Sequence, residues 1–195
     1  MRKGNPNFGV IEMAELRDYR AEFDPDLKFE DFPKDILVKL LRLYAQLYQK
    51  LDGFWYLSAK GRVNNDEALA CDMWVWERQT RQEISGLTKL LKIDGNDVMS
   101  MMKTLQISPW GFSHKFEVEF KDKNDAVLTF TYCPALEALE KEGEGREQTI
   151  CRVVDPIMKR RFAWLFNPAI EVVPLKLPPR ESGEEICCQW RFRLK

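Results

Sequence analysis

At the segment "SPWG" (residues 108–111) the spacing of the hydrophobic residues changes from the helical period of 3.6 to the strand period of 2, and this change constrains the fold more than any other feature. Before it, apolar residues recur at steps of three and four, the spacing of amphipathic helices. After it, Phe116, Val118 and Phe120 alternate with charged residues, the spacing of a strand with one buried face. We therefore expect a helical first half and a second half that contains a sheet.

Three helices are predicted in the first half. The first begins near Asp35 and extends through Gly53 to a stop at Gly61. The others cover about residues 66–92 and 96–106, and short connections predict that these helices pack antiparallel. The stripe of the first helix that is expected to face the core consists of Leu37, Leu40, Leu41, Tyr44, Leu47, Tyr48 and Leu51.

The second half is predicted to hold a β-hairpin, two helices and a last strand. The hairpin pairs residues 112–120 with 126–133 across the turn "KDKND". The helices are expected over about residues 134–141 and 152–166, a proline-rich extended edge over 167–185, and the last strand over 186–194.

The predicted domain organisation is an arm followed by one domain. Residues 1–32 are polar and punctuated by proline, so we expect them to form an N-terminal arm. Residues 33–195 are expected to form one domain, with a helical half over about 33–107 and a sheet-containing half over about 108–195.

Composition excludes several classes of function. The chain has 30 basic and 31 acidic residues, which argues against a nucleic-acid-binding protein. It has no apolar run of the roughly 20 residues that span a bilayer, and its N-terminus lacks the apolar centre of a secretory signal. The five cysteines are irregularly spaced, which argues against a disulfide framework. We expect a cytoplasmic protein with no membrane partner.

The cysteines carry the most chemical information. Alternation along "ICCQWRFRL" predicts that Cys188 faces the core and Cys187 the polar side of the last strand. Cys133 precedes a proline and is predicted to cap a helix N-terminus, and Cys151 lies at the entry to the next helix. A thiol in the field of a helix N-terminus has a lowered pKa, so both are candidate reactive thiols.

Two interpretations of these cysteines remain open. In the first, Cys133, Cys151 and Cys188 converge, with Asp155 or His114, to bind a metal such as zinc or iron or to present a nucleophile. In the second, they are small buried hydrophobic residues, since no CxxC pair is present. His114, the one histidine, is either a hydrogen-bonded core residue or a general base.

Aromatic and basic residues offer candidate ligand contacts. Trp74 and Trp190 could form aromatic walls for a planar ligand, although tryptophan also fills cores. Lys159, Arg160 and Arg180 are among the cations that could bind an anionic group, or that simply face solvent. No glycine-rich phosphate loop is present, so a nucleotide-phosphate site has no support.

Longer segments of the second half resemble a known group. The segments are "YCPALEALEKEG", "CRVVDPIMKRRFAWLFNPAIEV" and "LPPRESGEEICCQWRF", with "LDGFWYL" and "EALACDMWVWE" in the helical half. They resemble L-2-amino-thiazoline-4-carboxylic acid hydrolase-like proteins and, more closely, an uncharacterised cytosolic family of anaerobic bacteria and archaea.

The resemblance implies a fold and a chemistry. It implies an α+β domain in which N-terminal antiparallel helices pack with a small antiparallel sheet and two C-terminal helices. It also implies that Cys133 or Cys151 acts as nucleophile or metal ligand, Asp155 as base or orienting group, and Arg180 as a clamp for a substrate carboxylate.

The functional hypotheses therefore fall in two classes. One is a domain with a cysteine-lined pocket that binds a metal or small molecule, with hydrolysis of a C–N bond in a cyclic amidine or amide as its candidate reaction. The other is a non-catalytic ligand-sensing or protein-interaction module with a tryptophan-rich pocket. The expected partners are a small-molecule ligand and a second copy of the chain in a homodimer.

Overall fold

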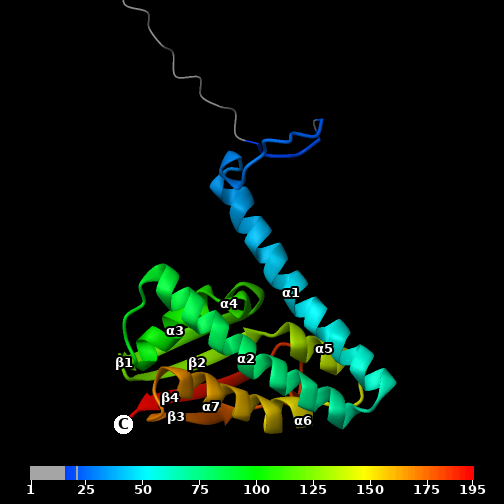
Figure 1. Cartoon of the computed structure of the whole chain (residues 1–195). Coiled ribbons are helices and arrows are strands. Elements are labelled where there is room, and N and C mark those ends of the chain that lie inside the picture. Colours follow the sequence, from blue (N-terminus) through cyan, green and yellow to red (C-terminus); the bar gives the residue numbers. More distant parts are fainter. Residues whose placement is uncertain (1–15, 21) are drawn as a thin grey trace, which may run out of the picture. The chain divides into compact units, whose positions relative to one another are not determined.

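The computed structural model describes residues 16–20 and 22–195 (Figure 1). Half of the predicted N-terminal arm, residues 1–15 and residue 21, lies outside this part. The chain divides into two compact units, one ending at Leu41 and one comprising Arg42–Lys195. The first unit holds the short 3-10 helix η1 (Phe29–Asp31) and the start of helix α1 (Lys34–Arg62). Everything below concerns the second unit.

The predicted helices of the first half are present. Helix α1 continues through Gly53 to Arg62, α2 covers Asn65–Leu91, and α3 covers Val98–Ile107. The side chain of Asn64 accepts the Glu67 N–H at 2.8 Å and caps α2. No helix in the part of the chain that the structure describes is both long and apolar enough to cross a membrane.

Helix α4 was not predicted, and it shortens the first strand. The segment predicted to begin that strand instead forms helix α4 (Pro109–Ser113), because Ser108 caps it and Pro109 is preorganised for its first turn. Gly111 permits the close junction between α3 and α4. An added Cβ there would lie 2.4 Å from the carbonyl oxygen of Gln106.

The sheet has four antiparallel strands in the order β1-β2-β4-β3, so the α+β fold class is confirmed. The strands are β1 (Lys115–Asp122), β2 (Asp125–Tyr132), β3 (Ile170–Lys176) and β4 (Cys188–Leu194). The predicted hairpin is β1–β2, and the last strand β4 pairs with both β2 and β3. Helix α5 covers Pro134–Glu142.

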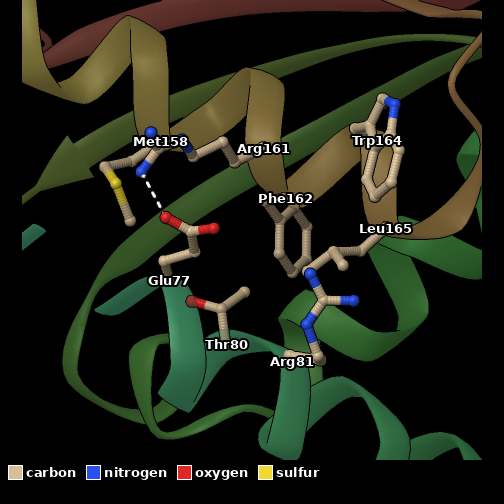
Figure 2. Close-up of a pocket in the computed structure, with 8 residues that line it drawn as sticks. All are labelled: Glu77, Thr80, Arg81, Met158, Arg161, Phe162, Trp164 and Leu165. Carbon is tan, nitrogen blue, oxygen red and sulfur yellow. Dashed lines mark hydrogen bonds and ion pairs between the residues drawn. The ribbon is translucent and has the colours of Figure 1, made fainter. Parts of the chain in front are cut away.

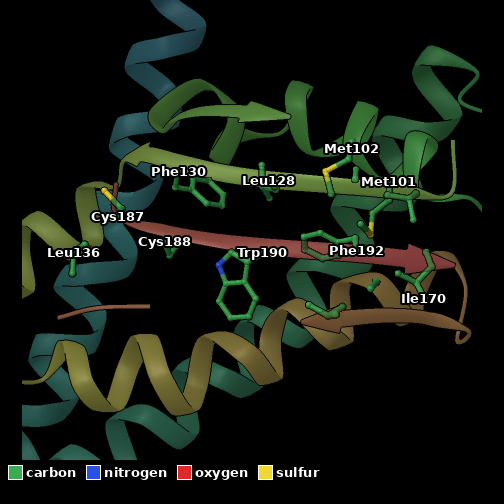
Figure 3. Packing of buried hydrophobic residues seen from close by; sticks show 14 residues of the cluster. Met101, Met102, Leu128, Phe130, Leu136, Ile170, Cys187, Cys188, Trp190 and Phe192 are labelled. Carbon is green, nitrogen blue, oxygen red and sulfur yellow. The ribbon is translucent and has the colours of Figure 1, made fainter. Parts of the chain in front are cut away.

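The core lies on one face of the sheet, against α3 and helix α7 (Asp155–Phe166) (Figure 3). Leu128 opposite Trp190 and Ala126 opposite Phe192 are buried cross-strand pairs of this face. Cross-strand polar contacts, such as Gln189 to Thr129 at 2.9 Å, also link β4 with β2. The face of the sheet that carries this core is also the face that borders the site described below.

Helix α7 is the last part of a longer helical run. The run begins with α6 (Glu147–Thr149) and passes through a π-helical turn, η2 (Ile150–Val154). In that turn the Asp155 N–H donates to the carbonyl of Ile150, five residues earlier. Pro156 follows and has no N–H for the carbonyl of Arg152, so the regular α-helical pattern is already broken here.

The predicted inward stripe of α1 is confirmed at Tyr48, which packs against Trp76 of α2, and is wrong at Tyr44, Leu47 and Leu51. Tyr44, Leu47 and Leu51 are about half exposed, and Phe54 and Trp55 further along are more exposed still. The side of α1 that contacts its own chain contains buried Ala45 and polar groups instead. The apolar pattern therefore predicted the helix correctly, but it did not predict which side of the helix faces the core.

Candidate functional site

The candidate site is centred on an ion pair in α7. Lys159 Nζ donates to both carboxylate oxygens of Asp155, at 2.6 and 2.8 Å. The two side chains are 19% and 30% exposed, so the pair is sunk in the protein but reaches its surface. Burial alone would lower the pKa of the Lys159 ammonium, yet the Asp155 carboxylate more than offsets it and the pKa is raised. The Lys159 side chain therefore stays protonated at neutral pH.

Two aromatic rings of the sheet face this ammonium group. Lys159 Nζ lies 4.8 Å from the Trp190 ring centroid on β4 and 5.4 Å from that of Phe130 on β2. Trp190 has no exposed surface, and its Nε1–H makes no hydrogen bond of normal geometry within residues 16–20 and 22–195, although it lies near enough to the Cys188 sulfur to lower the pKa of that thiol slightly. An unpaired buried N–H is costly, so it marks a place where an acceptor would be stabilised.

The three predicted cysteines surround this ion pair. The thiols of Cys133, Cys151 and Cys188 interact electrostatically with one another and with both Asp155 and Lys159. They come from three separate elements: the N-terminus of α5, the π-helical turn η2, and the first residue of β4. The three thiols are thus close enough to influence one another's ionisation, and whether they form a site or perform chemistry stays a prediction.

The expected lowering of the thiol pKa values is wrong. Burial raises the pKa of Cys133 to about 11 and that of Cys188 to about 12. Burial, reinforced by the Asp155 carboxylate, raises the pKa of Cys151 as well. Cys133 does cap α5, because its sulfur accepts the Leu136 N–H at 3.4 Å, but this contact is weaker than the cost of burying a thiolate. Cys151 lies inside a continuous helical run and so has no helix N-terminus beside it.

His114 lies beside the site. It caps the C-terminus of α4, and its ring is 4.7 Å from that of Trp110 and 5.4 Å from that of Phe130. Nδ1 donates to the Trp110 carbonyl at 3.0 Å, since a carbonyl only accepts, and Nε2 then carries the lone pair. Burial lowers the pKa of His114 to about 4, and Lys159 and Asp155 are close enough to influence it. The ring is therefore neutral, with an acceptor at Nε2.

Arg180 has a different role from the predicted carboxylate clamp. Its side chain is 2% exposed, and its guanidinium donates to Glu140, to Glu137 and to the carbonyls of Gly183 and Glu185. Glu140, followed by Glu137, raises the pKa of Arg180 despite burial. These partners occupy the guanidinium fork, so Arg180 fixes the loop before β4 onto α5 rather than offering free donors to a ligand.

Cys187 was expected on the polar face of the last strand and is buried instead. Strand β4 begins only at Cys188, so alternation does not extend to Cys187. Its sulfur accepts from Arg180 Nη1 at 3.7 Å and lies against the backbone amide of Cys133. Burial raises the pKa of Cys187 despite this guanidinium.

Trp74 does not take part in the site. It is exposed on α2, where the Arg78 guanidinium stacks 3.6 Å above its ring. A separate cavity of about 100 Å³ lies between α2 and α7 (Figure 2). The Glu77–Arg161 ion pair crosses its wall at 2.9 Å. The cavity is lined by Glu77, Thr80, Arg81, Met158, Arg161, Phe162, Trp164 and Leu165, and none of these is a cysteine.

A metal at the thiol cluster finds no support in the geometry. Within the described residues, no three side chains of His, Cys, Asp or Glu are placed to hold one metal ion. The expectation that Cys133, Cys151 and Cys188 hold zinc or iron is therefore not carried further.

Comparison with known proteins identifies the family alone. A family model described as a family of unknown function, DUF6125, matches residues 30–194. The chain belongs to the DUF6125 family. No curated protein and no solved structure matches it. The DUF6125 match does not support the relation to thiazoline hydrolase-like proteins or the expected taxonomic range.

Lys159 is the residue whose importance the sequence understated. It is one of three consecutive basic residues, the usual pattern of a solvated helix face. One signal was available: Asp155 lies four residues earlier, the spacing of a helical ion pair, and Cys151 four residues before that. A run of three positions at steps of four places Lys159 on the same face as the two predicted site residues.

Proposed function

We propose that this DUF6125 protein binds a small polar molecule at the Lys159–Asp155 pair. The observation that carries the proposal is the fully buried Nε1–H of Trp190, which makes no hydrogen bond of normal geometry in the described residues and lies beside a partly buried ion pair. Lys159 has three N–H donors and uses its contacts to Asp155 for at most two of them. The site therefore offers two donors to an acceptor atom of a ligand.

The charge of the site selects the ligand class. Lys159 and Asp155 neutralise each other and His114 is uncharged, so a ligand with a net charge would add an uncompensated buried charge. An amide matches the available groups: its oxygen would accept from Lys159 and Trp190, and its N–H would donate to Asp155 or to His114 Nε2. A compact amide or neutral amidine is the proposed ligand class.

Binding is favoured over thiol catalysis. Cys133, Cys151 and Cys188 are protonated at neutral pH because burial raises their pKa values, and a thiol is a far weaker nucleophile than a thiolate. Their proposed role is to line the site as soft, polarisable walls. All five cysteines are free, which suits the reducing conditions of the cytoplasm.

Thermal shift measurements test this proposal. The probe is pyrrolidinone, a cyclic amide, and its N-methyl derivative is the ligand control because it lacks the N–H. Pyrrolidinone is expected to raise the melting temperature of the wild type and of Arg160→Met, whose side chain is exposed on the same helix, but not that of Lys159→Met. Equal shifts with both probes, or in all three proteins, contradict the proposal.

A turnover assay separates binding from hydrolysis. If a cyclic amidine is opened by the protein and iodoacetamide abolishes that turnover, the hydrolase hypothesis replaces the binding proposal. No turnover combined with a Lys159-dependent thermal shift is the result that the geometry favours.

A further inference from the structure

Helix α1 presents an apolar face to solvent. Between Arg42 and Arg62, the largest exposed side chains are Phe54 at 68% and Trp55 at 70%. Tyr44, Leu47 and Leu51 continue this face toward the start of the helix. The spacing from 44 to 47, 51 and 54 is three, four and three residues, so these side chains form one straight stripe along the helix.

The amphipathic pattern of α1 is inverted. The side toward its own chain makes polar contacts: Tyr56 donates to Asn65 at 2.8 Å, and Lys60 pairs with Glu142 at 3.1 Å. Tyr48 packs edge-on against Trp76 of α2 on the same side. In an isolated soluble helix pair the apolar face turns inward. The outward stripe therefore requires a partner.

We propose that this stripe is the interface of a homodimer, in which α1 of one copy packs against α1 of a second copy. A two-fold interface uses the same patch on both subunits, so the patch must complement itself. The stripe contains no charged residue at positions 44, 47, 51, 54 or 58. A charge-free patch matches its own copy and resembles the cores of homodimer interfaces, which are depleted in charge.

The exposed area is sufficient for a stable dimer. Tyr44, Leu47, Leu51, Phe54 and Trp55, with the exposed flanking residues Leu43 and Leu57, expose on the order of 800 Å² together, if an aromatic residue is taken as about 200–250 Å² and leucine as somewhat less. A standard interface buries roughly 800 Å² on each partner. The largest apolar patch of a typical monomer is roughly 300–600 Å², so the face of α1 exceeds what a monomer usually leaves uncovered.

Sedimentation velocity on the full chain tests the dimer. The wild type is expected to sediment as a dimer over a micromolar to sub-millimolar range. Leu51→Glu is expected to weaken the dimer at least about a hundredfold, because the charge enters a two-fold interface twice. The matched control is Leu90→Glu, which places the same charge on another exposed leucine, near the end of α2, and leaves the dimer intact. Unchanged circular dichroism shows that each variant is folded.

A footprint on the wild type tests the same surface without substitution. Phe54 and Trp55 are expected to be protected from hydroxyl radicals at high protein concentration and labelled after dilution. A monomeric wild type, a Leu51→Glu variant that still dimerises, or unprotected Phe54 and Trp55 overturns the proposal. So does a monomer that binds phosphatidylcholine vesicles, since the stripe would then face lipid. None of these results depends on the ligand site, which lies on other elements.

Discussion

Lys159 Nζ lies 4.8 Å from the ring centroid of Trp190, and the indole N–H of that tryptophan makes no hydrogen bond of normal geometry within the described residues. Lys159, which is paired with Asp155, thus supplies a charged N–H donor, and Trp190 supplies an indole N–H donor beside it. Both sit on rigid elements, α7 and β4, that pack in the same core. Such preorganised donors are typical of a binding site that is formed before its ligand arrives.

A double-mutant cycle measures the coupling energy between Lys159 and Asp155. Asp155→Asn leaves the ammonium without its counter-charge and is expected to lower the free energy of unfolding by about 2–4 kcal/mol. Lys159→Met combined with Asp155→Asn is expected to recover much of that loss, because neither charge is then left unpaired. Urea unfolding of the four proteins measures the cycle. Additive losses would show that the pair is not coupled.

His114 predicts an acid-dependent loss of stability. Its pKa is lowered by burial from 6.5 to about 4, so the unfolded chain takes up a proton at a higher pH than the folded chain does. The contribution is complete above pH 6.5 and is lost as pH falls toward about 4, by up to roughly 3 kcal/mol. His114→Phe keeps an aromatic ring between Trp110 and Phe130 and lacks this titration.

The measurement for His114 is a difference between two proteins. Burial raises the pKa of Asp72 and Glu83 to about 7. These two carboxyl groups make the free energy of unfolding rise as pH falls, which is opposite to the contribution of the histidine over a similar pH range. The free energy of unfolding of the wild type minus that of His114→Phe cancels them. This difference is expected to fall as pH is lowered from 6.5 to 4. A difference that does not change with pH contradicts a neutral buried imidazole.

Two glycines make a matched pair for packing. Gly111→Ala would place Cβ 2.4 and 2.5 Å from the backbone oxygens of Gln106 and Leu105, so it is expected to cost about 1–3 kcal/mol as the α3–α4 junction opens. Gly86→Ala, within α2, meets nothing within 4 Å and is expected to stabilise by about 0.5–1 kcal/mol. Thermal unfolding measures both. A neutral Gly111→Ala would show that the junction is looser than described.

We predict that position 180 requires the shape of a guanidinium group and not only a positive charge. Its guanidinium holds Glu137, Glu140 and two loop carbonyls together, and lysine cannot reproduce that fork. Arg180→Met is expected to destabilise by about 2–4 kcal/mol and Arg180→Lys by more than half as much. Proteolysis of the loop before β4 should increase in both. Full recovery by lysine would show that charge alone suffices.

Local patterns predicted most of the fold. The change of period at residues 108–111 separated the helical half from the sheet, and the alternation in "ICCQWRFRL" placed Cys188, Trp190 and Phe192 in the core. The exception was α4, where Ser108 and Pro109 form a helix start that outweighed the alternation of the next residues. The pattern of α1 showed a helix but not which side faces its own chain, because an apolar stripe is the same whether it covers a core or a partner.

The sequence indicated which residues lie near one another better than it indicated their chemical state. Cys133, Cys151, Cys188 and Asp155 lie close enough to interact electrostatically, and their forming one functional site stays a prediction. Spacing could not give the depth of burial, and burial reverses the expected direction of the thiol pKa values. The assignment of Arg180 failed for a related reason: its acidic partners come from α5, about 40 positions earlier in the chain.

The most direct test of the proposed site is the indole N–H resonance of Trp190 in heteronuclear NMR, assigned by its disappearance in Trp190→Phe. On addition of pyrrolidinone we expect that resonance to move downfield, as an N–H does when it gains an acceptor, while the indole resonance of exposed Trp74 stays in place. The shift should be absent in Lys159→Met. A Trp190 resonance that does not respond to any amide, or that moves equally in Lys159→Met, would contradict a ligand site at the Lys159–Asp155 pair.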